Sequence, residues 1–169
     1  MDGVALLRVA FTDLHKELLE DVDGLTPDEL FWQPAGGVNH IGFLLWHIVR
    51  DEDTVICQAV LDRPQLWARD GWAGRLGLPA DEQGTGLESA GLSRIRYDIS
   101  AFLGYAYEVF EQTDAALAAM RADRLGEALT WSTDWRLANL LTTGCLSHGW
   151  VHLGEIRQLR GLRGWKFRE

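Results

Sequence analysis

Two histidines near the end of the chain, His148 and His152, have the spacing of metal ligands on one helix. An α-helix turns about 100° and rises about 1.5 Å per residue, so imidazoles four residues apart stack on one face, about 6 Å apart along the axis. Their nitrogens can then converge on a single metal ion. The same spacing also occurs by chance, with both histidines simply hydrogen-bonded, and that alternative stays open for the pair taken alone.

The helical wheel places His148 and His152 inside an apolar stripe, together with Glu155. Ionisable groups on a buried face are costly unless something satisfies them, and a metal ion would satisfy the histidines. Gly144, one turn earlier, would leave open space beside them. The expected apolar stripe consists of Leu137, Leu140, Leu141, Gly144, Val151, Leu159 and Leu162.

A third ligand is available on an earlier helix. His47 lies at the flank of that helix's apolar face, beside Leu44 and Asp51, where a side chain can point between helices. Three histidines with an open coordination position are typical of a catalytic site and suit zinc or nickel. Asp51 is a candidate to orient a histidine or to activate a bound water. The alternative for Asp51 is a surface charge.

The remaining histidines and the cysteines are weaker candidates. We expect His15 to be a partly buried core residue and His40 to belong to the cap of the second long helix. A nucleophilic pair of Cys145 and His148 is an alternative to metal ligation. The only other cysteine is Cys57, and with no CxxC motif both thiols are expected to be free and buried.

Composition excludes several other classes of protein. The chain has 169 residues, of which 47% are hydrophobic and 24% charged, which is typical of a single globular domain spanning 1–169. The net charge of −9 and the lack of a basic face argue against nucleic-acid binding. The one basic group, at 157–168, is expected to complement the negative end of a helix.

No stretch has the length to span a bilayer, and the first residues do not resemble a signal peptide, so we expect a cytoplasmic protein. HExxH, ExxH, GxGxxG and P-loop motifs are absent from the sequence.

Hydrophobic periodicity predicts an all-α protein. Apolar residues recur at helical spacing over four ranges, 4–22, 39–61, 92–120 and 137–160. Thr26 and Glu29 flank Pro27 as a capping box, which predicts a short helical turn over 26–34. The residues 129–131 are candidates for extended structure. Four amphipathic helices of this length favour a four-helix bundle.

The segment 62–91 differs from the rest of the chain. It holds two prolines and six glycines, and it contains Trp67 and Trp72. We expect a long Gly/Pro-rich loop between the second and third long helices. Loops of this length inside a compact domain are often functional, as a lid or a pocket wall. A packed surface loop with two aromatic anchors is the alternative.

Taken together, these residues resemble the DinB/YfiT-like superfamily. The resemblance consists of His47 within LLWHIVRDED and of SHGWVHLGEIRQLRG, which is similar to the family's HxxxHxG[QE] motif. Gly154 and Glu155 occupy the last two positions of that motif. The segment LWARDGWAGRLGLP and the helix around Tyr105 also resemble one branch of the family, so the resemblance extends over most of the chain.

The resemblance implies a four-helix bundle in which His47, His148 and His152 bind a divalent metal, zinc or nickel. Characterised relatives include mycothiol-dependent maleylpyruvate isomerase and bacillithiol transferases, in which the metal is thought to activate the thiol of the cofactor. Many relatives form dimers. Glu155 stands where glutamine is common, which adds a charge next to the site.

Two functions are therefore expected, and a purely structural role is the alternative. The first is a metal-dependent transferase or isomerase that uses a low-molecular-weight thiol and a small-molecule substrate, in a homodimer without nucleic-acid or membrane partners. The second is a non-catalytic metal-binding or stress-related protein, and the third is a structural bundle without metal. The candidate catalytic residues are Asp51 and Glu155. The candidate cofactor-binding residues are Trp46, Trp72 and Tyr105, although core packing is the commoner role for such aromatics.

Overall fold

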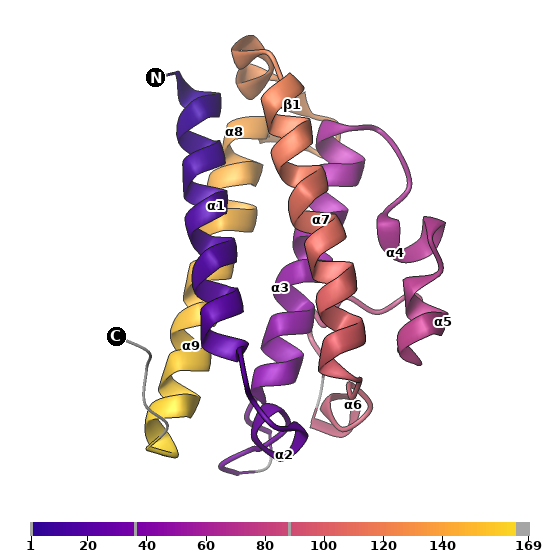
Figure 1. Cartoon of the computed structure of the whole chain (residues 1–169). Coiled ribbons are helices and arrows are strands. Elements are labelled where there is room, and N and C mark those ends of the chain that lie inside the picture. The colour runs from indigo at the N-terminus through magenta and orange to yellow at the C-terminus, as the bar shows by residue number, and fades with distance from the viewer. Residues whose placement is uncertain (1, 36, 88, 165–169) are drawn as a thin grey trace.

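The protein is mostly helical, with four long helical segments side by side (Figure 1). The computed structural model describes residues 2–35, 37–87 and 89–164. Two of the segments are α-helical throughout and two contain a stretch of π-helix. The four segments are α1 (Gly3–Val22), α3 (Ile41–Val55) with η1 (Ile56–Val60), α7 (Ile99–Ala119), and α8 (Leu137–Asn139) with η3 (Leu140–Ser147) and α9 (His148–Leu162).

Side-chain caps begin the helices where the sequence provides acceptors. Asp2 accepts the Ala5 N–H at 2.9 Å, at the start of α1. The capping box expected at Thr26 and Glu29 is present and begins the short helix α2 (Pro27–Leu30). His40 begins α3 by accepting the Phe43 N–H at 2.9 Å, as expected. Each cap satisfies a backbone donor that has no partner within the helix.

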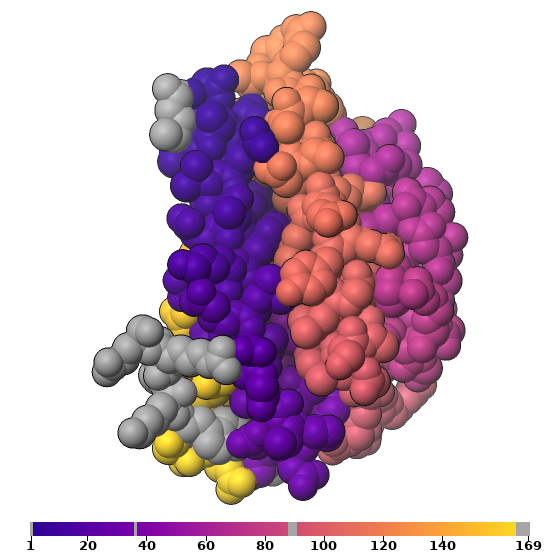
Figure 2. All heavy atoms as spheres, viewed as in Figure 1, coloured from indigo at the N-terminus to yellow at the C-terminus, as the bar shows by residue number. Residues whose placement is uncertain are grey.

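The predicted apolar faces of the first three long helices form the core. α1 packs against α7 and α9, and α3 packs against the same two helices. On α1 the expected residues are all buried, and on α3 the same holds. Figure 2 shows α1 and α7 closing one face of the molecule, with α4 (Leu66–Arg69) and α5 (Trp72–Leu76) covering the flank of α7. The sequence pattern predicts buried faces that consist of Leu7, Phe11, Leu14, Leu18, Val22, Ile41, Leu44, Leu45, Ile48, Val55, Ile95, Ile99, Phe102, Ala106, Phe110, Leu117 and Met120, and all of these are buried except Ile99, which is partly buried.

The apolar stripe predicted for the last helix is right at Leu137, Leu141 and Leu159 but wrong at Val151 and Leu162. Val151 and Leu162 are 60% and 62% exposed, whereas Gly149, Leu153 and Ile156 are buried. The cause is the π-helical stretch η3, in which each turn takes up more residues than in an α-helix. The extra residue moves the buried face of α9 one position along the chain.

The segment 62–91 is not one irregular loop, because α4 and α5 lie within it and α6 (Ser89–Leu92) begins before its end. Residue 88 lies outside the described residues. Trp67 and Trp72 are the expected anchors, since they are 1% and 3% exposed. The third long helix begins at Ile99 rather than near 92, because Asp98 caps it and accepts the Ala101 N–H at 2.8 Å.

A small hairpin precedes the last long helix. After the 3₁₀ turn η2 (Ala122–Gly126), strand β1 (Ala128–Leu129) pairs antiparallel with β2 (Ser132–Arg136). Residues 130 and 131 form the turn, so only Leu129 of the candidate extended residues is in a strand.

Two further features concern the surface of the molecule. Within the basic group, Arg157 donates to Asp21 of α1 at 2.6 Å, and Arg160 donates to the Asp21 carbonyl, so the group ties α9 to α1. Residues 165–168 of that group lie outside the described part. No helix among the described residues is long and apolar enough to cross a membrane.

Candidate metal site

α3 and α9 bring His47, His148 and His152 together. One ligand atom from each histidine lies within 4.8 Å of the other two. The Nε2 atoms of His148 and His152 are 2.8 Å apart. The His47 ring centroid is 4.9 Å from that of His148 and 5.2 Å from that of His152. The three residues that the sequence singled out thus form one cluster.

The close approach of the helices around Gly149 sets this geometry. A Cβ atom built at Gly149 would lie 2.6 Å from Leu14 Cδ2 and 3.6 Å from Ile48 Cγ2. Gly149 therefore lets α9 approach both α1 and α3, directly beside His148. Gly144, which was expected to leave space beside the histidines, instead faces Leu140 and Trp135. The π-helical register explains this difference as well.

The burial of the three histidines is the reverse of what the sequence predicts, because His47 is more buried than His148 and His152. His47 is 7% exposed and stacks on Phe43, with ring centroids 5.6 Å apart. The side chains of His148 and His152 are 32% and 15% exposed. They lie at the edge of the buried face of α9 and not in its middle, because that face is shifted by one residue. The cluster is therefore reachable from the α9 side.

Each histidine uses Nδ1 for a hydrogen bond to an oxygen that can only accept. His148 Nδ1 donates to Asp51 Oδ2 at 3.3 Å, and His152 Nδ1 donates to Glu155 Oε2 at 2.9 Å. His47 Nδ1 donates to the backbone carbonyl of Gln83. These partners fix the tautomer, so each neutral ring carries its remaining lone pair on Nε2. Three lone pairs then meet in the centre of the cluster.

Gly84 allows the 81–84 backbone to close over His47. Its φ of +94° lies in the region that favours glycine, and a Cβ there would lie 2.9 Å from Phe43 and 3.0 Å from His47 Nδ1. A side chain at this position would push the Gln83 carbonyl away from the ring. The glycine is thus part of what holds His47 in place.

Burial and a neighbouring carboxylate shift the pKa values of two of these histidines in opposite directions. The pKa of His47 is lowered, mainly because burial disfavours the imidazolium. The pKa of His148 is raised, mainly by its hydrogen bond to Asp51. A deeply placed neutral ring and a more basic one beside a carboxylate are both suited to binding a cation.

Sequence reasoning missed the buried acidic residues that follow Asp51. Glu52 is 1% exposed, accepts the His15 Nε2 proton at 2.9 Å and accepts the Thr113 hydroxyl at 2.5 Å. His15 also stacks on Phe110, with ring centroids 3.8 Å apart, which agrees with the core role expected for it. In the sequence, only the position of Glu52 around the helix could have indicated that it is buried. The charged residues next to it obscured that indication.

Asp53 is the second buried acid. Its carboxylate accepts the backbone N–H groups of Leu66 and Trp67, at 3.0 and 2.9 Å, and so caps α4. It also accepts the Tyr105 hydroxyl at 2.8 Å and pairs with Arg50 at 3.5 Å. Asp53 thereby anchors the start of the 62–91 segment on α3.

The aromatic residues predicted to bind a cofactor lie in the core. Trp46, Trp72 and Tyr105 are 0%, 3% and 0% exposed. Trp72 donates to Glu108 at 3.0 Å, and Trp72 and Tyr105 are in contact, with ring centroids 5.6 Å apart. Packing is thus the role that the structure shows for these three side chains.

Both cysteines are free and buried, as expected. Burial is the main cause that raises the pKa of Cys145 well above its usual range. His148 directs its nitrogens toward Asp51 and His152. The alternative of a Cys145–His148 nucleophilic pair therefore lacks a thiol that ionises readily, and the His148 nitrogens face other partners.

Comparison with known proteins shows the family and the fold of the chain. The model of the DinB superfamily matches residues 10–156. The chain belongs to the DinB superfamily. No curated protein matches the chain. A solved structure, described as a conserved protein from Enterococcus faecalis, has a similar fold and is 18% identical. It matches with a TM-score of 0.82 over 95% of this chain and 96% of the other.

Proposed function

We propose that His47, His148 and His152 bind one divalent metal ion, zinc or nickel, as the centre of a thiol-dependent transferase or isomerase. The observation that carries the metal part of the proposal is the convergence of one nitrogen from each of the three histidines, all within 4.8 Å of one another. Two unprotonated nitrogens 2.8 Å apart repel each other unless a cation or a shared proton lies between them. Outer hydrogen bonds from metal-binding histidines to carboxylates and carbonyls are the usual pattern.

The residues of this chain would hold and orient the reacting groups. A divalent cation with an open coordination position supplies Lewis acidity, which lowers the pKa of a thiol or a water molecule. Asp51 and Glu155 each hold a histidine ring through Nδ1, so we infer that they are positioning residues. The side chain of Glu155 is 44% exposed, and its negative charge would add to the attraction of the cluster for a cation.

Three wider features belong to the same proposal. We infer that the four long helical segments form the four-helix bundle of the superfamily, with 62–91 as the connection between its second and third helices. The protein would act in the cytoplasm on a small-molecule substrate. It would be a homodimer without nucleic-acid or membrane partners.

Elemental analysis and metal titration test the metal. Gently purified protein is expected to hold about one zinc or nickel ion per chain. His148→Ala should lose it, whereas His15→Gln, which keeps a donor for Glu52 outside the cluster, should retain it. Asp51→Ala should weaken the metal affinity about 10- to 100-fold, because the histidine loses its orienting partner. Protein that purifies without metal and shows no thermal shift with zinc or nickel would contradict the proposal.

The thiol chemistry needs a separate test. Metal-loaded protein is assayed with a panel of cellular thiols and electrophiles, with His148→Ala as the inactive control. Turnover that depends on both metal and thiol supports the proposed enzyme. If chelation lowers the melting temperature but no combination turns over, the protein is a non-catalytic metal-binding module. At a free metal concentration about 100 times Kd, binding adds about 2.7 kcal/mol to the free energy of unfolding.

A further inference from the structure

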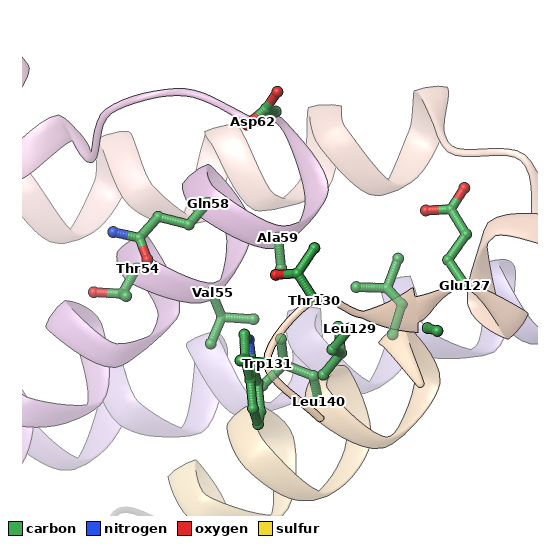
Figure 3. Close-up of a pocket in the computed structure, with 12 residues that line it drawn as sticks. Thr54, Val55, Gln58, Ala59, Asp62, Glu127, Leu129, Thr130, Trp131 and Leu140 are labelled. Carbon is green, nitrogen blue, oxygen red and sulfur yellow. The ribbon is translucent and has the colours of Figure 1, made fainter. Parts of the chain in front are cut away.

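A groove lies between the end of α3 with η1, the β1–β2 hairpin and the start of the last long helix. It has a volume of about 560 Å³, within the usual range for small-molecule sites. Figure 3 shows Val55, Ala59, Leu129, Leu140 and Trp131 gathered at its centre, with polar side chains around them. None of the three candidate metal ligands lines this groove.

The groove continues the helix face that carries the histidine cluster. His47, Asp51 and Val55 follow one another at four-residue steps on α3, so Val55 lies about 12 Å along the helix from His47. On the facing segment, Leu140 begins the π-helical stretch η3, which ends directly before His148. The bond between Asp51 and His148 fixes these two faces against each other. The groove therefore lies further along α3 from the cluster, on the face of α3 that carries His47 and Asp51.

The charge of the groove favours a cationic ligand. Its charged lining residues are Asp62 and Glu127, and no lysine, arginine or histidine lines it. Glu127 is neutralised by an ion pair with Arg124 at 3.1 Å. Asp62 is exposed, and the described residues provide no hydrogen bond or ion pair to its carboxylate. One uncompensated negative charge thus lies at the rim.

The backbone at Asp62 is unusual for a residue that carries a side chain. Asp62 follows the C-terminal end of η1 with a φ of +49°. Glycine is the usual residue in this left-handed position after a helix. Every other described residue with positive φ in this chain is a glycine. A non-glycine residue in this region carries strain, which is often found at binding sites.

The hairpin places a large aromatic ring at the same groove. Trp131 is 66% exposed at the turn between β1 and β2, and its ring centroid is 6.2 Å from that of Trp135. An exposed indole provides a flat surface for an apolar ring and attracts a cation over its face. Neither the core nor the strand pairing requires this side chain.

We propose that this groove binds a small molecule that joins a flat apolar ring to a protonated amine. Asp62 supplies the negative charge, and Trp131 with the apolar floor supplies the contact for the ring. The further step, that this ligand is the substrate carried to the histidine cluster, rests on the proposed metal-dependent function. Binding in the groove does not depend on that function.

The test compares three probes that share an indole ring with a two-carbon side chain and differ in the charge of the terminal group: tryptamine, tryptophol and indole-3-propionate. Calorimetry at low salt is expected to give the tightest binding for tryptamine and no binding for the propionate. Asp62→Asn keeps a residue that tolerates the left-handed conformation, and it should weaken tryptamine binding about three- to fivefold while leaving tryptophol unchanged. High salt should remove the same difference. Trp131→Ala should weaken both probes.

A matched control and a metal-free arm complete the experiment. Trp150→Ala removes another partly exposed tryptophan, on α9, which does not line the groove, and it should leave all three affinities unchanged. The order of the probes should persist after chelation, so a failure of the metal proposal leaves this test intact. Equal binding of tryptamine and the propionate, or an unchanged tryptamine affinity in both Asp62→Asn and Trp131→Ala, would overturn the proposal.

Discussion

At the scale of single residues, the hydrogen-bond partner of each imidazole decides what that imidazole can do. In the cluster, Asp51, Glu155 and the Gln83 carbonyl take the Nδ1 protons and leave three acceptors facing inward. At His40 the order is reversed, because Nδ1 accepts the Phe43 N–H and Nε2 donates to the Leu92 carbonyl at 3.1 Å. The same side chain is a candidate ligand in one place and a helix cap in the other.

The cap at His40 predicts a pH dependence of stability. Burial is the main cause that lowers the pKa of His40 below its ordinary value of about 6.5, so the unfolded chain binds this proton more readily than the folded one. The contribution to stability is present above about pH 6.5 and is lost as the pH falls below it, at up to about 1.4 kcal/mol per pH unit. Urea denaturation between about pH 7.5 and about pH 5.5 measures the loss.

His40→Asn is the matched variant for this measurement, because asparagine is a good N-cap that does not titrate. The variant should lose less stability than the wild type over the same pH range. Only the slopes are compared, since the substitution also removes the hydrogen bond to the Leu92 carbonyl. Equal slopes in the two proteins would show that His40 does not titrate in this way.

At the scale of elements, π-helical turns and glycine contacts set which faces meet. η3 shifts the buried face of α9 by one residue, which places Gly149 against Leu14 and leaves His148 and His152 at the edge. π-helical turns inside α-helices often occur at functional sites. Here the shift leaves His148 and His152 partly exposed on one side of the cluster.

The contact at Gly149 predicts opposite effects for two glycine substitutions in one helix. Gly149→Ala places a Cβ 2.6 Å from buried Leu14, and overpacking of this kind costs about 1–3 kcal/mol, more than the gain of up to about 1 kcal/mol in helix propensity. Gly154→Ala meets nothing within 4 Å and should raise the free energy of unfolding by about 0.5–1 kcal/mol. Urea denaturation of both variants checks the signs, and two stabilised variants would refute the packing role of Gly149.

At the scale of the whole molecule, buried charges fix segments that lie far apart in the chain. Asp53 ties α3 to α4 and α7, Glu52 ties it to α1 and α7, and Asp21 joins α1 to α9. A buried carboxylate is costly unless it is fully hydrogen-bonded, so each of these acids holds its partners in one arrangement. The histidine cluster is supported from several sides as a result.

A tightly packed core predicts that both thiols are unreactive in the native protein. Burial is the main cause that raises the pKa of Cys57 to about 11, and Cys145 is shifted in the same direction. A thiol reagent such as Ellman's reagent should therefore label native protein only through slow opening of the structure. Both thiols should react at once in concentrated urea, which serves as the control. Rapid labelling of the native protein would show that one cysteine is accessible.

The sequence by itself determined the helical class, three of the four apolar faces and the three histidines of the cluster. Those features depend on local periodicity and on residue chemistry, and both can be read directly from the amino-acid sequence. Only the tertiary structure decided the register of α9, the burial of Glu52 and Asp53, and the groove at Asp62. A π-helical turn leaves no reliable pattern in one sequence, and a buried acid is recognised only by partners from other helices. The contact between Gln83 and His47 joins two residues that are 36 positions apart in the chain. The sequence around either residue therefore could not indicate this contact.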